Sequence, residues 1–363
     1  SLALLGELDA LRIPEHAYVN PETDAAHCCG HHAQMAGIFG AALALTVPEI
    51  AEKLGGQVVF FATPAEEYGE IEFKNQLREQ GKIRYGGGKC ELIRTGAFDD
   101  IDLCLAHHIQ PGDEIQVGSG TGNGFVSKVI RYLGKAAHAA GAPDKGVNAL
   151  SAASLGLQAL GLNRETFRDE DCVRVHPIIT KGGNLVNVIP DEIVIETLVR
   201  AKTIEAFTDA AKKTDRSFQA GAVAMGAKVE ITTLPGYLPT LAEQALPELK
   251  RAAELAAPEV PVREAAGHSG GSTDVGDVQH LMPVYTFNTG GVKGGLHQIN
   301  FEVTNEEEAY IDTAKMFALA AYGLLKEKAA RSKELVKNYK PVFKDSAEYT
   351  KFMEQFDSKE VLD

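Results

Sequence analysis

The sequence predicts an α/β fold in which a mostly parallel sheet flanked by helices is interrupted by a second, ferredoxin-like unit. Apolar, strand-like runs alternate with helix-like runs before residue 107, and this alternation is typical of a parallel sheet. A glycine-rich stretch at residues 118–124 then changes the pattern. The order βαββαβ that follows is that of the ferredoxin-like unit. After Gly236 the first pattern returns, so we expect one domain split by an insertion.

The first part of the split domain is expected to place polar side chains where its strands end. Its predicted elements are strands at 2–8, 57–62 and 101–106 and helices at 33–47 and 71–81. The strands end at Glu7 and Asp9, at Glu66 and Glu67, and at His107 and His108. Ligands of open α/β sheets gather at the carboxyl ends of strands, so these side chains are predicted to face one site.

The insertion and the second part of the split domain follow in order. The insertion is predicted to contain a strand at 125–133, a helix at 146–161, strands at 173–181 and 192–200, a helix at 203–225 and a strand at 228–233. The split domain resumes with a helix at 241–256, a strand at 283–288 and a helix at 305–327. We divide the chain into a first part (1–119), the insertion (120–236), a second part (237–328) and a charged, helical, peripheral C-terminal tail (329–363). Because the chain opens directly on a buried strand, an N-terminal portion of the split domain is expected to be missing.

The bulk composition argues against several classes of partner. The chain has 363 residues, 44% hydrophobic and 24% charged, as in an ordinary globular protein of about two domains. Its net charge of −14 argues against nucleic acid or an anionic membrane, because both require a basic face. No apolar run approaches the roughly 20 residues of a membrane span, and no secretory signal is visible. Five irregularly spaced cysteines favour reduced thiols and a cytoplasmic location.

Residues 27–32 contain two sulfurs and three imidazoles, and Cys29 and His31 are the candidate metal ligands among them. Alternate side chains at a strand or loop end share a face, so a Cys-x-His pair offers two ligands at close range. The alternative for such a pair alone is a buried cysteine beside a hydrogen-bonded histidine.

The other strand ends offer further candidates. Glu66 and Glu67 are adjacent carboxylates, which are rarely both buried without a nearby cation. One would bind a metal and the other would act as general base; the alternative is a solvated acidic loop. His107 and His108 point to opposite faces, and His108 is the preferred ligand because a turn follows it. His297 lies in a glycine-containing loop, where a lone histidine is more often a surface residue, so it is expected only as the last ligand of the set.

Together these residues resemble the dinuclear-metal amidohydrolases of the aminoacylase and carboxypeptidase superfamily. The nearest subgroup contains indole-acetyl-amino-acid hydrolases, hippurate hydrolases and p-aminobenzoyl-glutamate hydrolases. The resemblance runs from Leu5 to about Leu325. It rests on the joint pattern Cys29-Gly30-His31, Pro64-Ala65-Glu66-Glu67, His108, Gly134-Lys135-Ala136-Ala137-His138-Ala139, Asn187-Val188-Ile189-Pro190-Asp191 and His297. It implies a zinc-peptidase-like catalytic domain interrupted by a lid and dimerisation domain.

The resemblance implies a role for each matching residue. The metal ligands would be Cys29, His31, Glu67, His108 and His297, and the general base would be Glu66. His138 would reach the active site of a neighbouring subunit and stabilise the oxyanion, which implies a homodimer formed through the lid. Asn187 and Arg200 would hold the substrate carboxylate, and Asp9 would support a metal ligand. Two divalent ions are implied, and zinc, manganese, nickel and cobalt all suit mixed sulfur, imidazole and carboxylate ligands.

The implied reaction is metal-dependent hydrolysis of the amide bond in an N-acyl or N-aroyl amino acid, or in a p-aminobenzoyl-glutamate-like substrate. The free carboxylate of such a small molecule suits the planar guanidinium of Arg200. The alternatives are a dipeptidase or amino-acid deacetylase on the same scaffold, and a relative that binds metal or ligand without catalysis. The joint presence of base, ligands and oxyanion histidine argues against the last.

Overall fold

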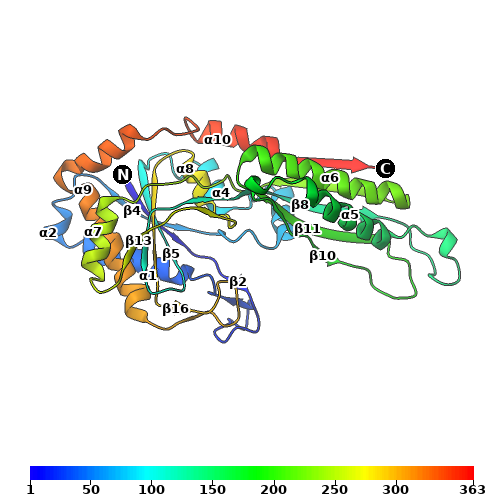
Figure 1. The fold of residues 1–363 in the computed structure, drawn as a ribbon, viewed down its shortest axis with the longest axis horizontal. Coiled ribbons are helices and arrows are strands. Elements are labelled where there is room, and N and C mark those ends of the chain that lie inside the picture. The colour runs from blue at the N-terminus through cyan, green and yellow to red at the C-terminus, as the bar shows by residue number, and fades with distance from the viewer.

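The computed structural model describes residues 1–363, and its first unit is built on a six-stranded sheet of order β13-β6-β15-β5-β1-β4 (Figure 1). We call it the parallel-sheet unit. Its parallel neighbours are β4 (Val58–Thr63), β1 (Leu2–Glu7), β5 (Leu103–Ile109) and β15 (Val284–Thr289). The short strand β6 (Ile115–Val117) pairs antiparallel with β15 and parallel with β13 (Val262–Glu264). The predicted α/β class with a mainly parallel sheet is confirmed.

The central strand β1 shows why the chain opens on an unbroken apolar run. Leu2 and Leu4 join a core cluster with α1 (His31–Leu45), α7 (Pro247–Ala256) and α9 (Thr313–Asn338). Ala3 and Leu5 join a different cluster, shared with the helices α3 (Ile71–Glu79), α4 (Gly88–Arg94) and α8 (Val275–Gln279). Successive side chains of a strand face opposite sides, so a strand covered on both faces must be apolar throughout. Polar side chains can therefore collect only at the strand ends.

The second sheet, which we call the inserted unit (residues 124–235), extends to the right in Figure 1. Its elements are β8 (Gly124–Leu133), α5 (Ala149–Asn163), β9 (Arg174–Val175), β10 (Ile178–Lys181), β11 (Glu192–Ala201), α6 (Ile204–Met225) and β12 (Lys228–Pro235). The strands are antiparallel in the order β10-β11-β8-β12. The strand predicted at 173–181 is split, because Pro177 lacks the N–H that a ladder requires. That this unit serves as a lid stays a prediction.

The C-terminal tail differs from its predicted form. The helix α9 is broken at residues 326–329, close to the predicted boundary at 328. Beyond it, α10 (Ser346–Met353) packs on α4, and β18 (Ser358–Leu362) pairs antiparallel with β12. The prediction of a helical tail is therefore wrong for its last residues, which form a strand. Ser-Lys-Glu-Val-Leu is too short and polar to indicate a strand by its own pattern, and the open edge of β12 supplies the partner that makes it one.

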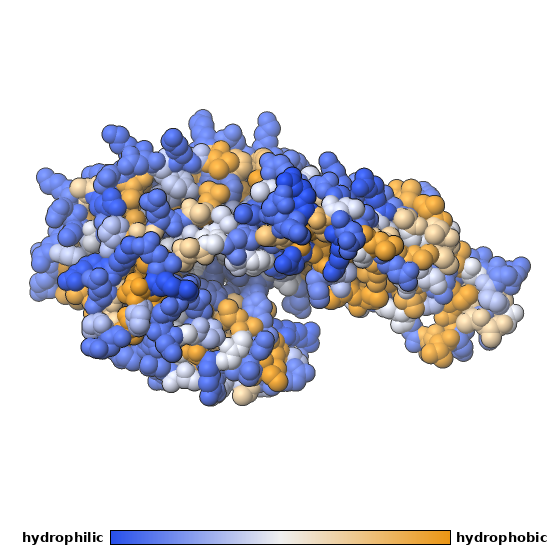
Figure 2. Space-filling model, in the orientation of Figure 1, coloured by the Kyte–Doolittle hydropathy of each residue, from blue (hydrophilic) through white to orange (hydrophobic).

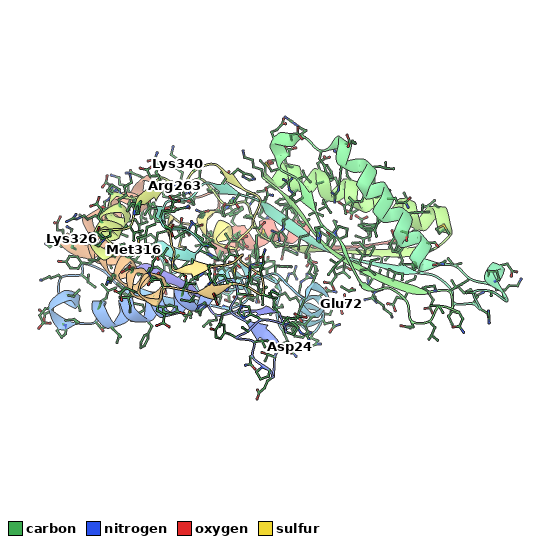
Figure 3. The ribbon with its side chains drawn as sticks, turned by 60° about the horizontal axis from the view of Figure 1, so that its bottom comes forward. Asp24, Glu72, Arg263, Met316, Lys326 and Lys340 are labelled. Atoms are coloured by element: carbon green, nitrogen blue, oxygen red, sulfur yellow. The ribbon has the colours of Figure 1, made fainter.

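The two units share one core where they meet. Tyr68 of the parallel-sheet unit, Phe125 at the start of β8 and Tyr237 just after β12 belong to the same cluster of buried residues. Glu72 lies at the margin of this junction (Figure 3). It accepts a hydrogen bond from the guanidinium of Arg131 at 3.0 Å. None of the helices combines the length and hydrophobicity that a membrane span requires.

Candidate metal centre

Five metal-capable side chains from four segments meet at the carboxyl edge of the parallel sheet. Cys29 and His31 stand at the start of α1, Glu67 follows β4, His108 lies near the end of β5, and His297 lies in the loop after residue 293. Their ligand atoms form two sets, each within 4.8 Å: Cys29, His31 and His108 in one, and Cys29, Glu67 and His297 in the other. The structure thus brings the five predicted ligands together, with the Cys29 sulfur common to both sets.

The distances place the sulfur between imidazoles. The Sγ atom of Cys29 lies 3.4 Å from Nε2 of His108 and 3.2 Å from Nε2 of His297. That nitrogen of His297 is also 3.1 Å from Oε1 of Glu67. One sulfur, three imidazoles and a carboxylate are donors that zinc and its first-row neighbours accept.

Two buried atoms of the set lack hydrogen bonds. Nε2 of His31 lies 3.1 Å from Oε2 of Glu7, and Oε1 of Glu67 lies 3.1 Å from Nε2 of His297, but neither atom has a hydrogen bond of acceptable geometry. Buried polar atoms in proteins are normally satisfied, and a cation accounts for two orphaned atoms that face the same sulfur. The residues present therefore fit divalent metal ions.

The sequence suggests that Cys29 and His31 share a face because side chains alternate along a strand. In the structure, a left-handed turn brings them together instead. Gly30 between them has φ +88°, a conformation that favours glycine. A Cβ atom there would also lie 2.1 Å from Cγ2 of Ile109. The helix then begins at His31, two residues earlier than predicted.

Asp9 orients this histidine. Its Oδ1 atom lies 3.2 Å from Nδ1 of His31, and its Oδ2 atom accepts the backbone N–H of Glu67 at 2.8 Å. Burial alone would raise the pKa of Asp9, but the hydrogen bond with His31 lowers it to about 2. Burial would likewise lower the pKa of His31, and the bond to Asp9 and the charge of Glu7 raise it to about 9. A carboxylate on Nδ1 leaves Nε2 free for a metal.

The two adjacent glutamates differ in their electrostatics. Burial and the charges of Glu7 and Asp274 raise the pKa of Glu66 well above its ordinary value. Burial also acts to raise the pKa of Glu67, but its contact with His297 lowers it. A carboxyl group with a raised pKa holds a proton more readily, so Glu66 suits proton transfer and Glu67 suits metal binding.

A buried ion network lies next to the centre, and no pattern in the sequence predicts it. Nζ of Lys89 donates to Oε1 of Glu7 at 2.5 Å and to Oδ1 of Asp274 at 2.6 Å. The other oxygen of Glu7 accepts a hydrogen bond from Gln34 at 2.8 Å. The signal that could have found it is Glu7 itself, because an acid at the end of a buried apolar strand needs a buried partner.

The inserted unit brings one predicted substrate residue to this centre. The Arg200 guanidinium lies 5.6 Å from the centroid of the Phe125 ring. Burial lowers the pKa of Arg200, and the electrostatic interactions with Tyr237, Glu66 and Glu67 oppose that shift only in part.

His138 and Asn187 lie at the opposite end of the inserted unit. Both are exposed, and the N–H of Ala139 donates to the Asn187 carbonyl at 2.9 Å. In the β8–β11 ladder Phe125 faces Arg200 at one end, and Leu133 faces Glu192 at the other. At about 3.3 Å per residue, these ends are ~26 Å apart. Within one chain, His138 and Asn187 are therefore remote from Arg200.

Comparisons with known proteins identify a family and several relatives. The sequence profile described as Peptidase family M20/M25/M40 matches residues 3–322. The Xaa-Arg dipeptidase of Mus musculus is 28% identical over 325 residues, covering 87% of this chain and 67% of that protein. One of the p-aminobenzoyl-glutamate hydrolase polypeptides of Escherichia coli (strain K12) is 30% identical over 208 residues, covering 55% of this chain and 39% of that protein. A dinuclear metal binding peptidase of the M20 family from Bacillus subtilis shares the fold, with a TM-score of 0.58, 23% identity and coverage of 89% and 81% of the two chains.

The family match extends over most of the chain and includes both parts of the parallel-sheet unit. The resemblance to dinuclear-metal amidohydrolases is confirmed at the level of the family, and the chain is a metal-binding hydrolase that acts on amide bonds. The roles of its individual residues stay predictions. On the profile match, this chain belongs to peptidase family M20/M25/M40.

Proposed function

We propose that this enzyme hydrolyses the amide bond of an N-acyl or N-aroyl amino acid, or of a p-aminobenzoyl-glutamate-like compound with a free carboxylate. The observation that carries the proposal is the pair of ligand sets that share the Cys29 sulfur. Glu66 lies beside them, with Oε2 4.0 Å from Nε2 of His31. The likeness to the Escherichia coli p-aminobenzoyl-glutamate hydrolase polypeptide supports the substrate class.

The proposed cofactors are two divalent ions: zinc, manganese, nickel or cobalt. One would be held by Cys29, His31 and His108, and the other by Cys29, Glu67 and His297. When bound, such ions lower the pKa of a coordinated water and polarise the carbonyl that is attacked.

Glu66 takes a proton from the attacking water and delivers it to the nitrogen of the breaking amide bond, which leaves as an amine. The raised pKa of its buried carboxyl group favours this shuttle. Arg200 anchors the substrate carboxylate, because a planar guanidinium donates two parallel hydrogen bonds to such a group. Phe125 holds the guanidinium from one side.

His138 and Asn187 serve the centre of a second copy of the chain in this proposal. The ~26 Å between their end of the inserted unit and Arg200 supports this assignment. Apolar residues are exposed on the same unit: Ile178 and Ile179 on the edge strand β10, and the fully exposed Val186 near Asn187. Figure 2 shows hydrophobic surface at this outer end. A homodimer formed there would bring an oxyanion donor, a group typically worth roughly 3–4 kcal/mol in the transition state.

A dipeptidase is the second candidate, because the likeness to the Mus musculus Xaa-Arg dipeptidase covers 87% of this chain. The same base, metal ligands and carboxylate anchor would serve both substrates. The difference lies in whether the group on the acyl side carries a free amine.

The test combines metal analysis with a substrate panel. We expect two ions per chain and turnover concentrated in one of three groups: N-acyl amino acids, p-aminobenzoyl-glutamate or dipeptides. Glu66→Gln should keep both ions and lose at least about 100-fold in kcat, as expected for a general base. Glu70→Gln, at an exposed position in the same loop, is the matched control. Full activity in Glu66→Gln would show that the base is misassigned.

A further inference from the structure

Two tyrosines exchange hydrogen bonds between the Glu66 turn and the connection to the inserted unit. The hydroxyl of Tyr237 donates to the carbonyl oxygen of Glu66 at 2.5 Å. The hydroxyl of Tyr68 donates to the carbonyl oxygen of Pro235 at 2.8 Å. Tyr68 lies two residues after Glu66, and Tyr237 lies two residues after Pro235. Each segment therefore holds the backbone of the other, and we call this arrangement the tyrosine clasp.

The two chain segments that lead into and out of residues 124–235 both contact the clasp. Phe125, at the start of β8, donates its backbone N–H to the carbonyl of Tyr237 at 2.8 Å. Its ring centroid lies 5.1 Å from that of Tyr68 and 4.6 Å from that of Tyr237. All three rings are at most 7% exposed. Aromatic pairs at these separations are favourable, so the clasp is a packed unit and not a surface contact.

The glycine run Gly86–Gly88 packs against the tyrosine clasp, and the sequence alone suggests no function for it. A Cβ atom at Gly86 would lie 2.6 Å from Cζ of Tyr68, and one at Gly87 would lie 2.2 Å from Cε1 of Tyr237. At Gly88 a Cβ would lie 1.5 Å from the carbonyl oxygen of Pro64. No side chain fits at these positions, so the run lets α4 approach both rings and the Glu66 turn.

The Glu66 turn depends on such outside support. Ala65 adopts φ +57°, in the left-handed region that non-glycine residues avoid. Its carbonyl accepts the N–H of Gly88 at 3.1 Å, and the carbonyl of Glu67 accepts a hydrogen bond from Lys74 at 3.0 Å. The carbonyl of Glu66 lies between these two carbonyls in the chain and accepts its hydrogen bond from Tyr237.

We propose that Tyr237 is a positioning residue for Glu66, and that the tyrosine clasp ties the orientation of this carboxylate to that of the inserted unit. The inference rests on the proposed role of Glu66 as general base. The same cluster supports Arg200, whose guanidinium lies over Phe125. Glu66 and Arg200 thus both contact one packed aromatic cluster, although they belong to different units.

The hydroxyl and the ring of Tyr237 have separable effects. Tyr237→Phe keeps the ring against Phe125 and removes only the hydrogen bond to Glu66. We expect kcat to fall about tenfold, as for loss of one buried hydrogen bond, with KM for the carboxylate substrate and the content of metal unchanged. Tyr132→Phe is the control, because that equally buried hydroxyl donates to the carbonyl of Phe218 at 2.7 Å inside the inserted unit; its kcat should equal that of the wild type.

Hydrogen exchange of the metal-free protein gives a readout apart from activity. Tyr237→Phe should raise the exchange rate of the backbone amides of residues 65–68, and Tyr132→Phe should not. Gly87→Ala tests the same contact from the other side, because its methyl group would collide with the Tyr237 ring. It should reproduce the kcat loss, and Gly161→Ala, where nothing lies within 4 Å, should not.

The outcomes separate the clasp from the proposed function. If Glu66→Gln is inactive while Tyr237→Phe and Gly87→Ala both keep wild-type kcat, the positioning role is overturned and the base stands. If Glu66→Gln is active, the base assignment fails first. If Tyr132→Phe lost activity and protection from hydrogen exchange to the same extent as Tyr237→Phe, Tyr237 would have only a general structural role, and the inference would be overturned.

Discussion

Lys89 shows how one side chain allows several carboxylates to share the edge of a sheet. Its ammonium is buried between Glu7 and Asp274, and Glu66 adds a further negative charge nearby. Burial would lower the pKa of Lys89, but the charges of Asp274 and Glu7 raise it far above the ordinary value. When one partner of a buried ion pair is removed, the other charge stays buried without compensation. This costs far more free energy of folding than the intact pair contributes.

Lys89→Met should therefore destabilise the protein by about 3–5 kcal/mol, measured as the free energy of unfolding in urea. Lys82→Met, at an exposed position before the glycine run, should change it little. The additional change Glu7→Gln should recover part of the loss, because it removes one of the stranded charges. An unchanged stability in Lys89→Met would contradict the network.

His280 gives a prediction on pH dependence. Its ring is 4% exposed, donates to the carbonyl of Gly276 at 2.7 Å and stacks on Phe343. Burial lowers the pKa of His280 below its ordinary value, and the bond to Gly276 opposes the shift only in part. Below about pH 6.5 the His280 ring takes up a proton in the unfolded chain, whereas in the folded chain it stays neutral until the pH falls further. Stability is thus complete above that pH and falls as the pH decreases towards the folded pKa.

The expected slope is up to about 1.4 kcal/mol per pH unit from this group in the range below pH 6.5. Urea unfolding of the metal-free protein across this range measures it. His280→Gln should flatten the slope, and His176→Gln, at an exposed position, is the comparison. An identical slope in wild type and His280→Gln would exclude the assignment.

At the scale of elements, the tail contacts both units. Tyr349 of α10 donates to Asp277 of α8 at 2.8 Å, and Arg78 of α3 donates to Asp357 at 2.6 Å. Phe356 then packs on Phe207 of α6, with ring centroids 5.3 Å apart. The strand β18 completes the attachment by pairing five residues with β12.

Truncation after Asp357 should lower the free energy of unfolding by about 1–3 kcal/mol, because five cross-strand pairs are lost. It also opens the edge of β12, and open edges favour self-association. Urea unfolding and size-exclusion chromatography measure the two effects. Lys359→Thr, which keeps the strand, is the control, and a truncated protein with wild-type behaviour in both assays would show that β18 contributes nothing.

The elements that the sequence predicts are those whose signal is local. The apolar run of β1 and the small-residue helix after His31 are read within a dozen residues, and Glu66-Glu67 is marked by its own chemistry. The tyrosine clasp joins residues 171 positions apart, and Lys89 meets Asp274 over 185 positions. Neither Tyr237 nor Lys89 carries a local sign of its partner. The strand β18 cannot be predicted for the same reason, because it is a strand only through its pairing with the distant strand β12.

At the scale of the whole molecule, the proposed reaction needs residues that one chain keeps apart. The ligand sets and Arg200 lie at the junction of the units, whereas His138 and Asn187 lie at the outer end of the inserted unit. A second copy that docks through that end would bring its His138 and Asn187 to the centre of the first copy, and the sheet would not have to bend. Symmetric pairing would then complete two centres at once.

Mixing Glu66→Gln protein with His138→Ala protein tests this arrangement. In a hybrid dimer, one centre combines an intact Glu66 from one chain with an intact His138 from the other. An equimolar mixture exchanged to equilibrium should regain about a quarter of wild-type activity, because half of the dimers are hybrids with one intact centre. A double variant mixed with wild type is the control. No recovery, with exchange of chains between dimers demonstrated, would show that His138 does not act across the interface.

The place of β18 also sets an order of assembly during synthesis. The inserted unit ends at residue 235, but its sheet lacks an outer strand until residues 358–362 have been made. Contacts between such distant segments form late, because long loops close at an entropic cost. The edge of β12 is therefore open during synthesis, when an unpaired strand is most exposed to neighbouring chains. A nascent chain arrested before residue 358 should consequently need a chaperone more than its finished counterpart does.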